Sequence, residues 1–232
     1  FKKVNFKNDV IFTWNGTTSG VCVPNGDWIP DIREGLTICD ATSAAFSMNL
    51  SWEKLDATTF SWQKVLGGEA QHGVIVLSKN TINRLENFTP NRAIPKIFQI
   101  SNKGKVNKKL FSGSTINTPS MLCVEDALDA LKWVKKVGGV KKTIELSNEN
   151  LKVVEKKIKN SIWLDFLPEQ ENIRSCTSIC LKVKATILKK YDAVDLKERM
   201  NNLFSFFEKE KIAYDINSYR DAPIGVRIWG GA

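Results

Sequence analysis

Two residues, a lysine and an aspartate, each follow an apolar segment and could together support amine chemistry. Lys64 lies in FSWQKVLGG (residues 60–68), after a β-branched and aromatic run and before a Gly-Gly turn. Asp40 lies in LTICDATSAAF (residues 36–46), directly after an apolar run. A lysine at a strand end beside an apolar wall can act as an amine nucleophile. A carboxylate can hold a proton on a pyridine nitrogen, so the pair meets the needs of a pyridoxal phosphate site.

Both residues also have a plain structural interpretation. Lys64 is one of 27 lysines, and by itself it fits a surface charge. Asp40, followed by Thr42 and Ser43, fits the N-cap of a following helix. The two residues alone do not distinguish a cofactor site from a surface charge and an N-cap, so the elements that position them must be considered.

The chain alternates strand-like and helix-like segments, which is typical of α/β folds. Apolar runs predict strands at Val10–Trp14, Leu36–Cys39, Thr58–Phe60 and, fully buried, Gly73–Leu77. Helical spacing predicts helices at Ser120–Val137, stopped by two glycines, and at Leu146–Lys159, with Ser147 as N-cap. In open α/β sheets ligands bind outside the carboxyl ends of the strands, where both Asp40 and Lys64 would lie.

The pattern changes after about residue 140. It predicts a half-buried strand at Thr177–Val183, a helix at Leu196–Glu210 that carries Leu203, Phe206 and Phe207, and strands at Ile212–Ile216 and Val226–Trp229. We therefore expect a large α/β domain with a mostly parallel sheet over residues 1–140 and a smaller α+β domain over residues 141–232.

Composition restricts the classes of function. The 232 residues carry 34 Lys and Arg against 25 Asp and Glu, a formal charge of +9, and no apolar run is long enough to span a membrane. Only 7 of the basic residues are Arg and the lysines are dispersed, which favours a solvated surface over a nucleic-acid interface. A Lys-rich protein that binds polyanions stays open as the non-enzymatic alternative. Five unpaired-looking cysteines indicate reduced thiols, and a single histidine excludes a histidine-rich metal site.

Five segments along the chain are distinctive: DATSAAF (40–46), SWQKVLGGEAQHG (61–73), KIFQI (96–100), TINTPSMLCVEDAL (115–128) and YRDAPIGVRIWGGA (219–232). In this order they resemble the phosphoserine aminotransferase family, fold-type-I pyridoxal phosphate enzymes of the class V aminotransferases. The resemblance covers nearly the whole chain. It implies a fold-type-I architecture in which residues 1–140 are the C-terminal part of the large cofactor-binding domain.

The resemblance also implies roles for four residues around the cofactor, pyridoxal 5'-phosphate. Lys64 matches the lysine that binds the cofactor covalently, and Gln63 matches a residue that hydrogen-bonds its phosphate. Asp40 matches the partner of the pyridine nitrogen. Thr17, in WNGTTSG, matches a threonine that contacts the ring oxygen. By itself, Thr17 fits an ordinary turn residue.

Four further residues match the partner-subunit and substrate positions of the family. Asn117 and Thr118 match the pair that reaches the cofactor phosphate of the neighbouring subunit in a homodimer with shared active sites. Arg227 matches the arginine that holds the substrate carboxylate, and Arg220 matches a second arginine near the substrate phosphate. The structural alternatives are a helix entry at 117–119, with Pro119 in the first turn, and an outward surface charge at Arg227.

The activity that follows from the resemblance is amino transfer from glutamate to 3-phosphohydroxypyruvate, giving phosphoserine and 2-oxoglutarate, in the cytoplasm and in serine biosynthesis. Another substrate that the family allows is 4-phosphohydroxythreonine, of pyridoxine biosynthesis. Nucleic acids and membranes are not expected partners, and no metal is expected. A serine– or alanine–glyoxylate aminotransferase is the enzymatic alternative.

One departure from the family concerns the start of the chain. Members of the family carry, upstream of the segment where this chain begins, a glycine-containing phosphate turn, an aromatic residue that stacks on the cofactor ring and a basic pair for the substrate phosphate. We therefore expect this chain to be an N-terminally truncated fragment that is inactive by itself.

Overall fold

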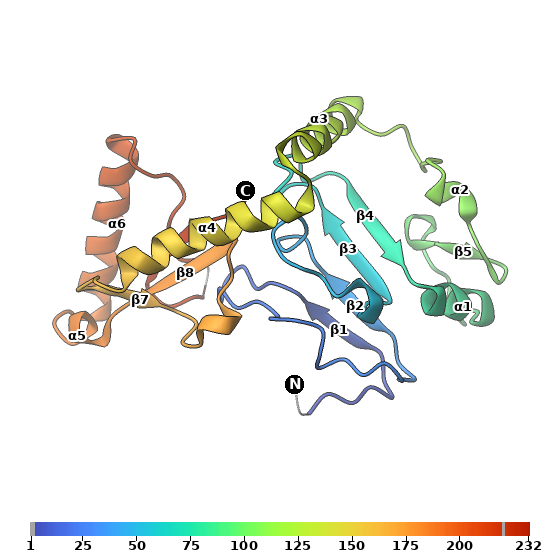
Figure 1. The fold of residues 1–232 in the computed structure, drawn as a ribbon, viewed down its shortest axis with the longest axis horizontal. Helices are drawn as coiled ribbons and strands as arrows, with labels where there is room; N and C mark the ends of the chain where they lie inside the picture. The colour runs from blue at the N-terminus through green and yellow to red at the C-terminus, as the bar shows by residue number, and fades with distance from the viewer. Residues whose placement is uncertain (1–2, 220) are drawn as a thin grey trace. The chain divides into compact units, whose positions relative to one another are not determined.

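The computed structural model describes residues 3–219 and 221–232 (Figure 1). Its contacts divide the chain into two compact units. Unit 1 comprises Phe1–Thr13, Asn25–Thr42 and Leu50–Trp133, and unit 2 comprises Trp14–Pro24, Ser43–Asn49 and Val134–Ala232. Two short early segments thus belong with the C-terminal part of the chain.

Unit 1 is built on a four-stranded sheet with the order β1-β2-β3-β4. The strands are β1 (Val10–Thr13), β2 (Thr37–Asp40), β3 (Ala57–Ser61) and β4 (Gly73–Leu77). The first three strands are parallel, and β4 runs antiparallel to β3. All four predicted strands and the mostly parallel sheet are confirmed.

The prediction that β4 is fully buried is wrong. Ile75 is 41% exposed and Val76 is 40% exposed. In the described sheet β4 is the last strand in the order and pairs only with β3. An apolar run cannot reveal from its composition whether it lies at an edge.

Unit 1 also contains short elements between and after the strands of the sheet, which the sequence pattern did not predict. These are η1 (Trp52–Lys54), α1 (Lys79–Asn87), η2 (Lys96–Phe98), β5 (Ser101–Asn102), β6 (Lys105–Val106) and α2 (Lys108–Phe111). Helix α1 begins at the N-cap Ser78, whose Oγ accepts a hydrogen bond from the Thr81 amide at 3.2 Å. Helix α3 (Met121–Val137) then ends before two glycines, as predicted.

A buried ion pair in unit 1 lies near the N-terminal ends of β2 and β3, at the opposite end of β2 from Asp40. The Arg33 guanidinium donates to Asp56 Oδ2 at 2.7 Å, and the side chains are 6% and 2% exposed. Asp56 also accepts from the Thr37 amide at 3.0 Å and from Ser78 Oγ at 2.8 Å. One carboxylate therefore ties the start of β2, the start of β3 and the entry to α1.

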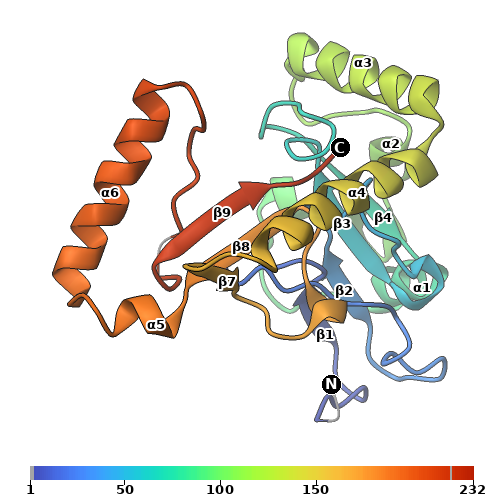
Figure 2. The same cartoon turned by 60° about the vertical axis from the view of Figure 1, so that its left-hand side comes forward.

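Unit 2 contains a second sheet, which is antiparallel throughout. Its strands are β7 (Leu164–Phe166), β8 (Ser178–Val183) and β9 (Gly225–Trp229), with β8 in the middle. The helical elements are α4 (Val140–Ile158), η3 (Glu171–Ile173), α5 (Ala185–Leu188) and α6 (Ala193–Lys209). In Figure 2, α6 runs alongside β9 and α4 crosses the same small sheet.

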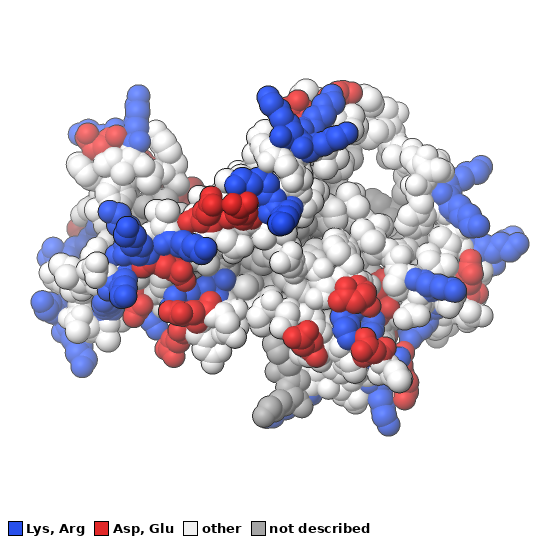
Figure 3. All heavy atoms as spheres, viewed as in Figure 1, with Lys and Arg blue, Asp and Glu red and all other residues white. Residues whose placement is uncertain are grey.

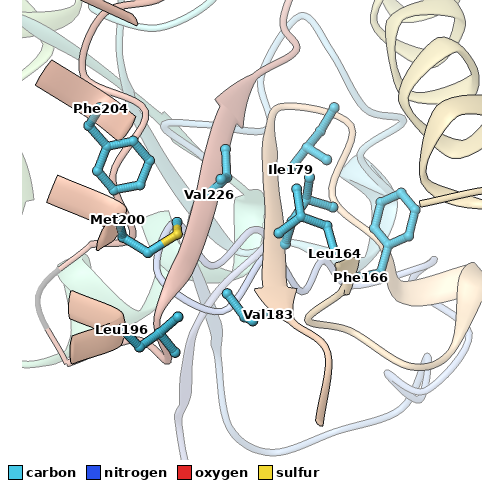
Figure 4. Close-up of a cluster of buried hydrophobic side chains, with 9 residues drawn as sticks. Leu164, Phe166, Ile179, Val183, Leu196, Met200, Phe204 and Val226 are labelled. Atoms are coloured by element: carbon cyan, nitrogen blue, oxygen red, sulfur yellow. The ribbon is translucent and has the colours of Figure 1, made fainter. Parts of the chain in front are cut away.

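The core of unit 2 lies between this sheet and the helices (Figure 4). Strand residues such as Ile179 and Val226 belong to one buried cluster with Leu196, Met200 and Phe204 of α6. Residues of α4 pack against the cluster from outside, including the predicted inward-facing Leu151, Val154 and Ile158. Burial of a side chain of this kind is worth about 1.5–3 kcal/mol before the entropy cost, so this cluster contributes strongly to the stability of unit 2.

Two predictions in unit 2 are wrong. Helix α4 begins at Val140, and Ser147 is a buried interior residue whose Oγ donates to the Thr143 carbonyl at 2.9 Å. Residues 212–216 form turns with one bridge nearby, not a strand. The predicted helix at Leu196–Glu210 is confirmed as α6, in which Phe204 is buried and Phe206 is 52% exposed.

Candidate functional site

The carboxyl ends of β2 and β3 bring the lysine and the aspartate to one edge of the sheet in unit 1. Asp40 is the last residue of β2 and pairs with Thr59 of β3. Strand β3 ends at Ser61, and Lys64 follows three residues later. Because these two strands are parallel, both side chains belong to the carboxyl edge, where ligands bind in open α/β sheets.

The turn that carries Lys64 has a defined backbone. The Gly67 amide donates to the Lys64 carbonyl, and the Gly68 amide donates to the Trp62 carbonyl, each at 2.9 Å. Gly67 has a φ of 67°, in the left-handed region that glycine adopts most easily. Lys64 and Gln63 are half-buried. The lysine therefore lies on a constrained turn beside the strand end, which a simple surface charge does not require.

Asp40 is exposed, so its carboxylate does not bear the cost of being buried without a partner. Its Oδ1 accepts a hydrogen bond from the Thr42 amide at 2.9 Å. Turns follow it, so the N-cap interpretation is wrong in its detail. The carboxylate shapes the turn after β2 and stays accessible to a ligand.

In unit 2, the loop that carries Thr17 packs on the middle strand of the small sheet. Cys180 Sγ, on β8, donates to the Thr17 carbonyl at 3.5 Å. Cys180 pairs with Arg227 of β9. Directly opposed residues of an antiparallel pair point to the same face, so Arg227 and Thr17 are neighbours of the same cysteine, on the face opposite the Leu181–Val226 pair of the core.

Arg227 is not an outward surface charge, since its side chain is only 20% exposed. A guanidinium nitrogen lies 3.3 Å from Asp215 Oδ2, and the guanidinium carbon lies 5.2 Å from the centre of the Tyr219 ring. Its Nε is buried without a hydrogen-bond partner among the described residues. A guanidinium held in this way can still offer donors to a carboxylate.

Neither Asp215 nor Tyr219 was predicted at the site. Asp215 has a φ of 48°, and this turn, in a segment predicted to be a strand, brings it toward Arg227. The sequence signal was present in the quoted segment 219–232, which contains Tyr219 and Arg227, but spacing alone could not pair them.

The remaining predicted site residues lie elsewhere. Asn117 and Thr118 are exposed on the segment between α2 and α3 in unit 1. Helix α3 begins at Met121, so Pro119 is not in its first turn. Arg220 lies outside the described residues.

Metal ligation and membrane insertion find no support in the described part of the chain. No group of three or more His, Cys, Asp or Glu side chains could hold a metal ion there. None of its helices combines the length and the apolar character needed to cross a bilayer. All five cysteines are free, and burial raises the pKa of Cys180 to about 11 although Arg227 acts to lower it.

The fold of the chain is that of the fold-type-I aminotransferases. A phosphoserine aminotransferase from Cytophaga hutchinsonii superimposes with a TM-score of 0.77 at 21% identity, over 96% of this chain and 58% of that one. A pyridoxal-phosphate-bound phosphoserine aminotransferase from Trichomonas vaginalis gives 0.71 at 18% identity, over 95% and 55%. An alanine–glyoxylate aminotransferase from Nostoc also gives 0.71, at 13% identity, over 97% and 56%. These similarities show the fold alone and do not distinguish between the enzymes that share it.

Sequence similarity distinguishes between these aminotransferases where the fold does not. The chain is 58% identical over 231 residues to the phosphoserine aminotransferase of Methanosarcina barkeri and 56% identical to that of Methanosarcina mazei. Each match covers the whole chain, which spans about 60% of the length of these relatives. No protein-family model matches. The predicted resemblance to phosphoserine aminotransferase is thereby confirmed as homology along the whole chain.

Proposed function

We propose that the protein to which this chain belongs is a phosphoserine aminotransferase. It transfers an amino group between glutamate and 3-phosphohydroxypyruvate and uses pyridoxal 5'-phosphate. The observation that carries the proposal is Lys64 on a constrained turn after β3, next to the strand that ends in Asp40. The high identity to curated phosphoserine aminotransferases supports the choice of substrate.

The residues present fit the cofactor by the chemistry of their donors. Lys64 supplies an amine, Asp40 an exposed carboxylate, and Gln63 a half-buried amide next to the lysine. When bound, pyridoxal phosphate supplies an electron sink for the carbanion that forms when the substrate Cα loses its proton. Asp40 would hold the proton on the pyridine nitrogen, Gln63 would hydrogen-bond the phosphate, and Thr17 would contact the ring oxygen.

Three side chains would contact the substrate. Arg227 would bind the α-carboxylate with its planar donor fork, oriented by the Asp215 contact and by the ring of Tyr219. The Lys64 amine would take the proton from the substrate Cα and return it, as a general base and acid. Arg220 would help to bind the substrate phosphate.

A direct test uses the protein as its gene encodes it, Lys64→Ala, and Lys141→Ala as a control at an exposed lysine of α4. We expect the wild type and the control to show the visible absorbance of lysine-bound pyridoxal phosphate, and Lys64→Ala to lose it together with transaminase activity. A wild-type protein that binds no cofactor would overturn the proposal and leave the polyanion-binding alternative.

Substrate preference separates the proposal from its enzymatic alternative, which the Nostoc alanine–glyoxylate enzyme represents by fold. Activity with phosphoserine, and not with serine or alanine plus glyoxylate, is the expected result. The opposite preference would favour the glyoxylate class. Use of 4-phosphohydroxythreonine would extend the role from serine to pyridoxine biosynthesis.

The proposal includes a cytoplasmic homodimer with shared active sites, in which Asn117 and Thr118 serve the neighbouring subunit. Their exposure supports a contact outside their own chain. Mixing Lys64→Ala with an Asn117→Ala/Thr118→Ala variant tests it. Half of the dimers would be mixed, each with one intact site, so on the order of a quarter of wild-type activity should return. Two inactive variants that stay inactive when mixed would contradict shared sites.

The proposal also includes the division of the chain into a large domain over residues 1–140 and a small domain over residues 141–232.

A further inference from the structure

Two stacked rings close the base of the loop that carries Lys64. This loop, residues 62–72, joins β3 to β4, and the last pair of the strand ladder is Ser61 with Gly73. Trp62 and His72 are the next residues outward. Their ring centroids are 5.4 Å apart and their planes meet at 17°. The stack therefore extends the pairing of β3 and β4 by one position, and at this position side chains make the contact.

Trp62 is also tied to the turn that presents the lysine. Its carbonyl accepts the Gly68 amide at 2.9 Å. A Cβ placed on Gly68 would lie 2.8 Å from Trp62 Cδ1, so the indole packs directly against the end of the turn. Ser61, the last residue of β3, donates from its Oγ to the His72 carbonyl at 3.1 Å. The indole thus packs against the end of the turn that carries Lys64, and a hydrogen bond between the two strands holds the residue on which the indole stacks.

Hydrogen bonding does not explain why the two rings lie together. Trp62 Nε1 and His72 Nδ1 are both buried without a hydrogen-bond partner among the described residues. Burial of such groups without partners is costly, and most buried polar atoms avoid it. Ring stacking is therefore the interaction that holds the two side chains together, although both nitrogens are buried without hydrogen bonds.

We propose that the Trp62–His72 stack positions the cofactor-binding lysine. His72 holds the indole, and the indole fixes the turn that carries Lys64 at the carboxyl end of β3. His72 is in this role a positioning residue that acts through Trp62. The inference rests on the proposed function, because it assumes that Lys64 binds pyridoxal phosphate.

The test compares His72→Leu, which removes the ring, with His72→Phe, which keeps one, and with Gln71→Ala at an exposed position of the same loop. Each protein, as its gene encodes it, is titrated with pyridoxal phosphate, reduced with borohydride and digested. Mass spectrometry then gives the modified fraction of Lys64. We expect His72→Leu to need about threefold to tenfold more cofactor for half-modification, while the other two stay near wild type.

Hydrogen exchange gives a measurement that needs no cofactor. Loss of the stack should speed exchange of the Gly67 and Gly68 amides, which bond within the turn, and leave the β3–β4 ladder protected. His72→Phe should restore the slow exchange.

Several outcomes would overturn the inference. These are wild-type labelling of Lys64 in His72→Leu, failure of His72→Phe to restore it, and loss of cooperative unfolding in His72→Leu, which would make the stack a requirement of the fold. If the wild type itself is not labelled at Lys64, the proposed function fails, and the exchange comparison alone then decides whether the stack orders the turn.

Discussion

Arg227 combines partial burial with an incomplete set of partners. Its ion pair with Asp215 leaves the guanidinium Nε buried without a hydrogen bond among the described residues. If the fork binds the substrate carboxylate, lysine cannot replace it, because an ammonium does not offer two parallel donors. We expect Arg227→Lys to lower kcat/KM for phosphoserine by about tenfold to a hundredfold, the worth of a hydrogen bond to a charged group.

The control for this prediction is another arginine that packs on a tyrosine. Arg199 lies with its guanidinium carbon 4.6 Å from the Tyr191 ring in the α5–α6 region. Arg199→Lys should leave steady-state kinetics unchanged. Equal effects of the two substitutions would show that Arg227 matters through packing and not through substrate.

The thiols of unit 2 give a second prediction at the residue scale. Burial raises the pKa of Cys22 and Cys180 to about 11 and that of Cys176 to about 12, from an ordinary value of 9.0. At pH 8 the reactive thiolate of a group with a pKa of 11 is only about one part in a thousand. Iodoacetamide should therefore label these cysteines slowly in the native protein and rapidly in urea, as measured by mass spectrometry. Fast native labelling of Cys176 would contradict its burial.

At the scale of the elements, the Arg33–Asp56 pair should stabilise unit 1 strongly. Asp56→Ala leaves the Arg33 charge buried without its partner and removes the acceptor for Thr37 and Ser78. We expect a loss of about 3–5 kcal/mol in the free energy of unfolding, measured by urea denaturation. Asp31→Ala is the control, because Asp31 is 86% exposed in its ion pair with Lys54, so its removal should change stability little.

The same carboxylate makes stability depend on pH in a definite direction. Burial raises the pKa of Asp56, but hydrogen bonds from Thr37, Arg33 and Ser78 outweigh it, so the pKa lies below its ordinary 3.8. Its stabilisation is fully present above the pKa of the unfolded chain and is lost as pH falls through the folded-state value. Asp56→Asn should flatten this acid limb of the stability curve. An unchanged limb would show that other carboxylates control acid unfolding.

A comparison of two glycines with almost the same φ angle distinguishes the cost of backbone strain from the cost of close packing. Gly20 has a φ of 68°, and a Cβ there would lie 2.8 Å from Cys180 Cβ. Gly67 has a φ of 67° with open space around it. Gly67→Ala should cost about 1–2 kcal/mol of backbone strain. Gly20→Ala should cost about 1–3 kcal/mol more, because the Thr17 loop must move from β8. Urea denaturation of both variants tests the difference, and equal losses would contradict the close packing.

The elements also show why some of the fold followed from sequence. Apolar runs such as those of β1 and β2 are short, bounded by turn signals and therefore predictable to within about two residues. The start of α4 was not, because Ser147 resembles an N-cap in sequence. In the structure its Oγ lies 2.9 Å from Ser47 Oγ, a residue one hundred positions away. Such a buried polar pair exists only once the chain has folded.

The candidate site likewise contains residues that the sequence could place and residues that it could not. Asp40 and Lys64 could be placed because the carboxyl ends of parallel strands share one edge, a rule that local pattern satisfies. The neighbours of Arg227 could not, because Asp215 reaches it through a left-handed turn inside an apolar stretch. The Trp62–His72 stack likewise depends on the β3–β4 register, which the sequence of one strand does not contain.

At the scale of the whole molecule, the charge distribution bears on the non-enzymatic alternative. The net charge of +9 arises mostly from lysine. On the face drawn in Figure 3, basic side chains lie in small groups, with acidic and uncharged surface between them. Several basic residues are already paired with acids, among them Lys142 with Glu145 and Lys182 with Glu169. A phosphate backbone needs many cations aligned on one surface.

We therefore expect only weak binding to duplex DNA. In fluorescence anisotropy at physiological salt, the apparent Kd should be no tighter than the roughly 10⁻⁴–10⁻⁶ M of non-specific association, and it should vanish as salt rises. Pyridoxal phosphate or phosphoserine should still bind under the salt conditions that abolish DNA binding, because buried and hydrogen-bonded contacts are screened less than exposed charges. Tight, saturable DNA binding with a steep salt dependence would instead show that the lysines form one continuous surface, and would favour the polyanion-binding alternative over amino transfer.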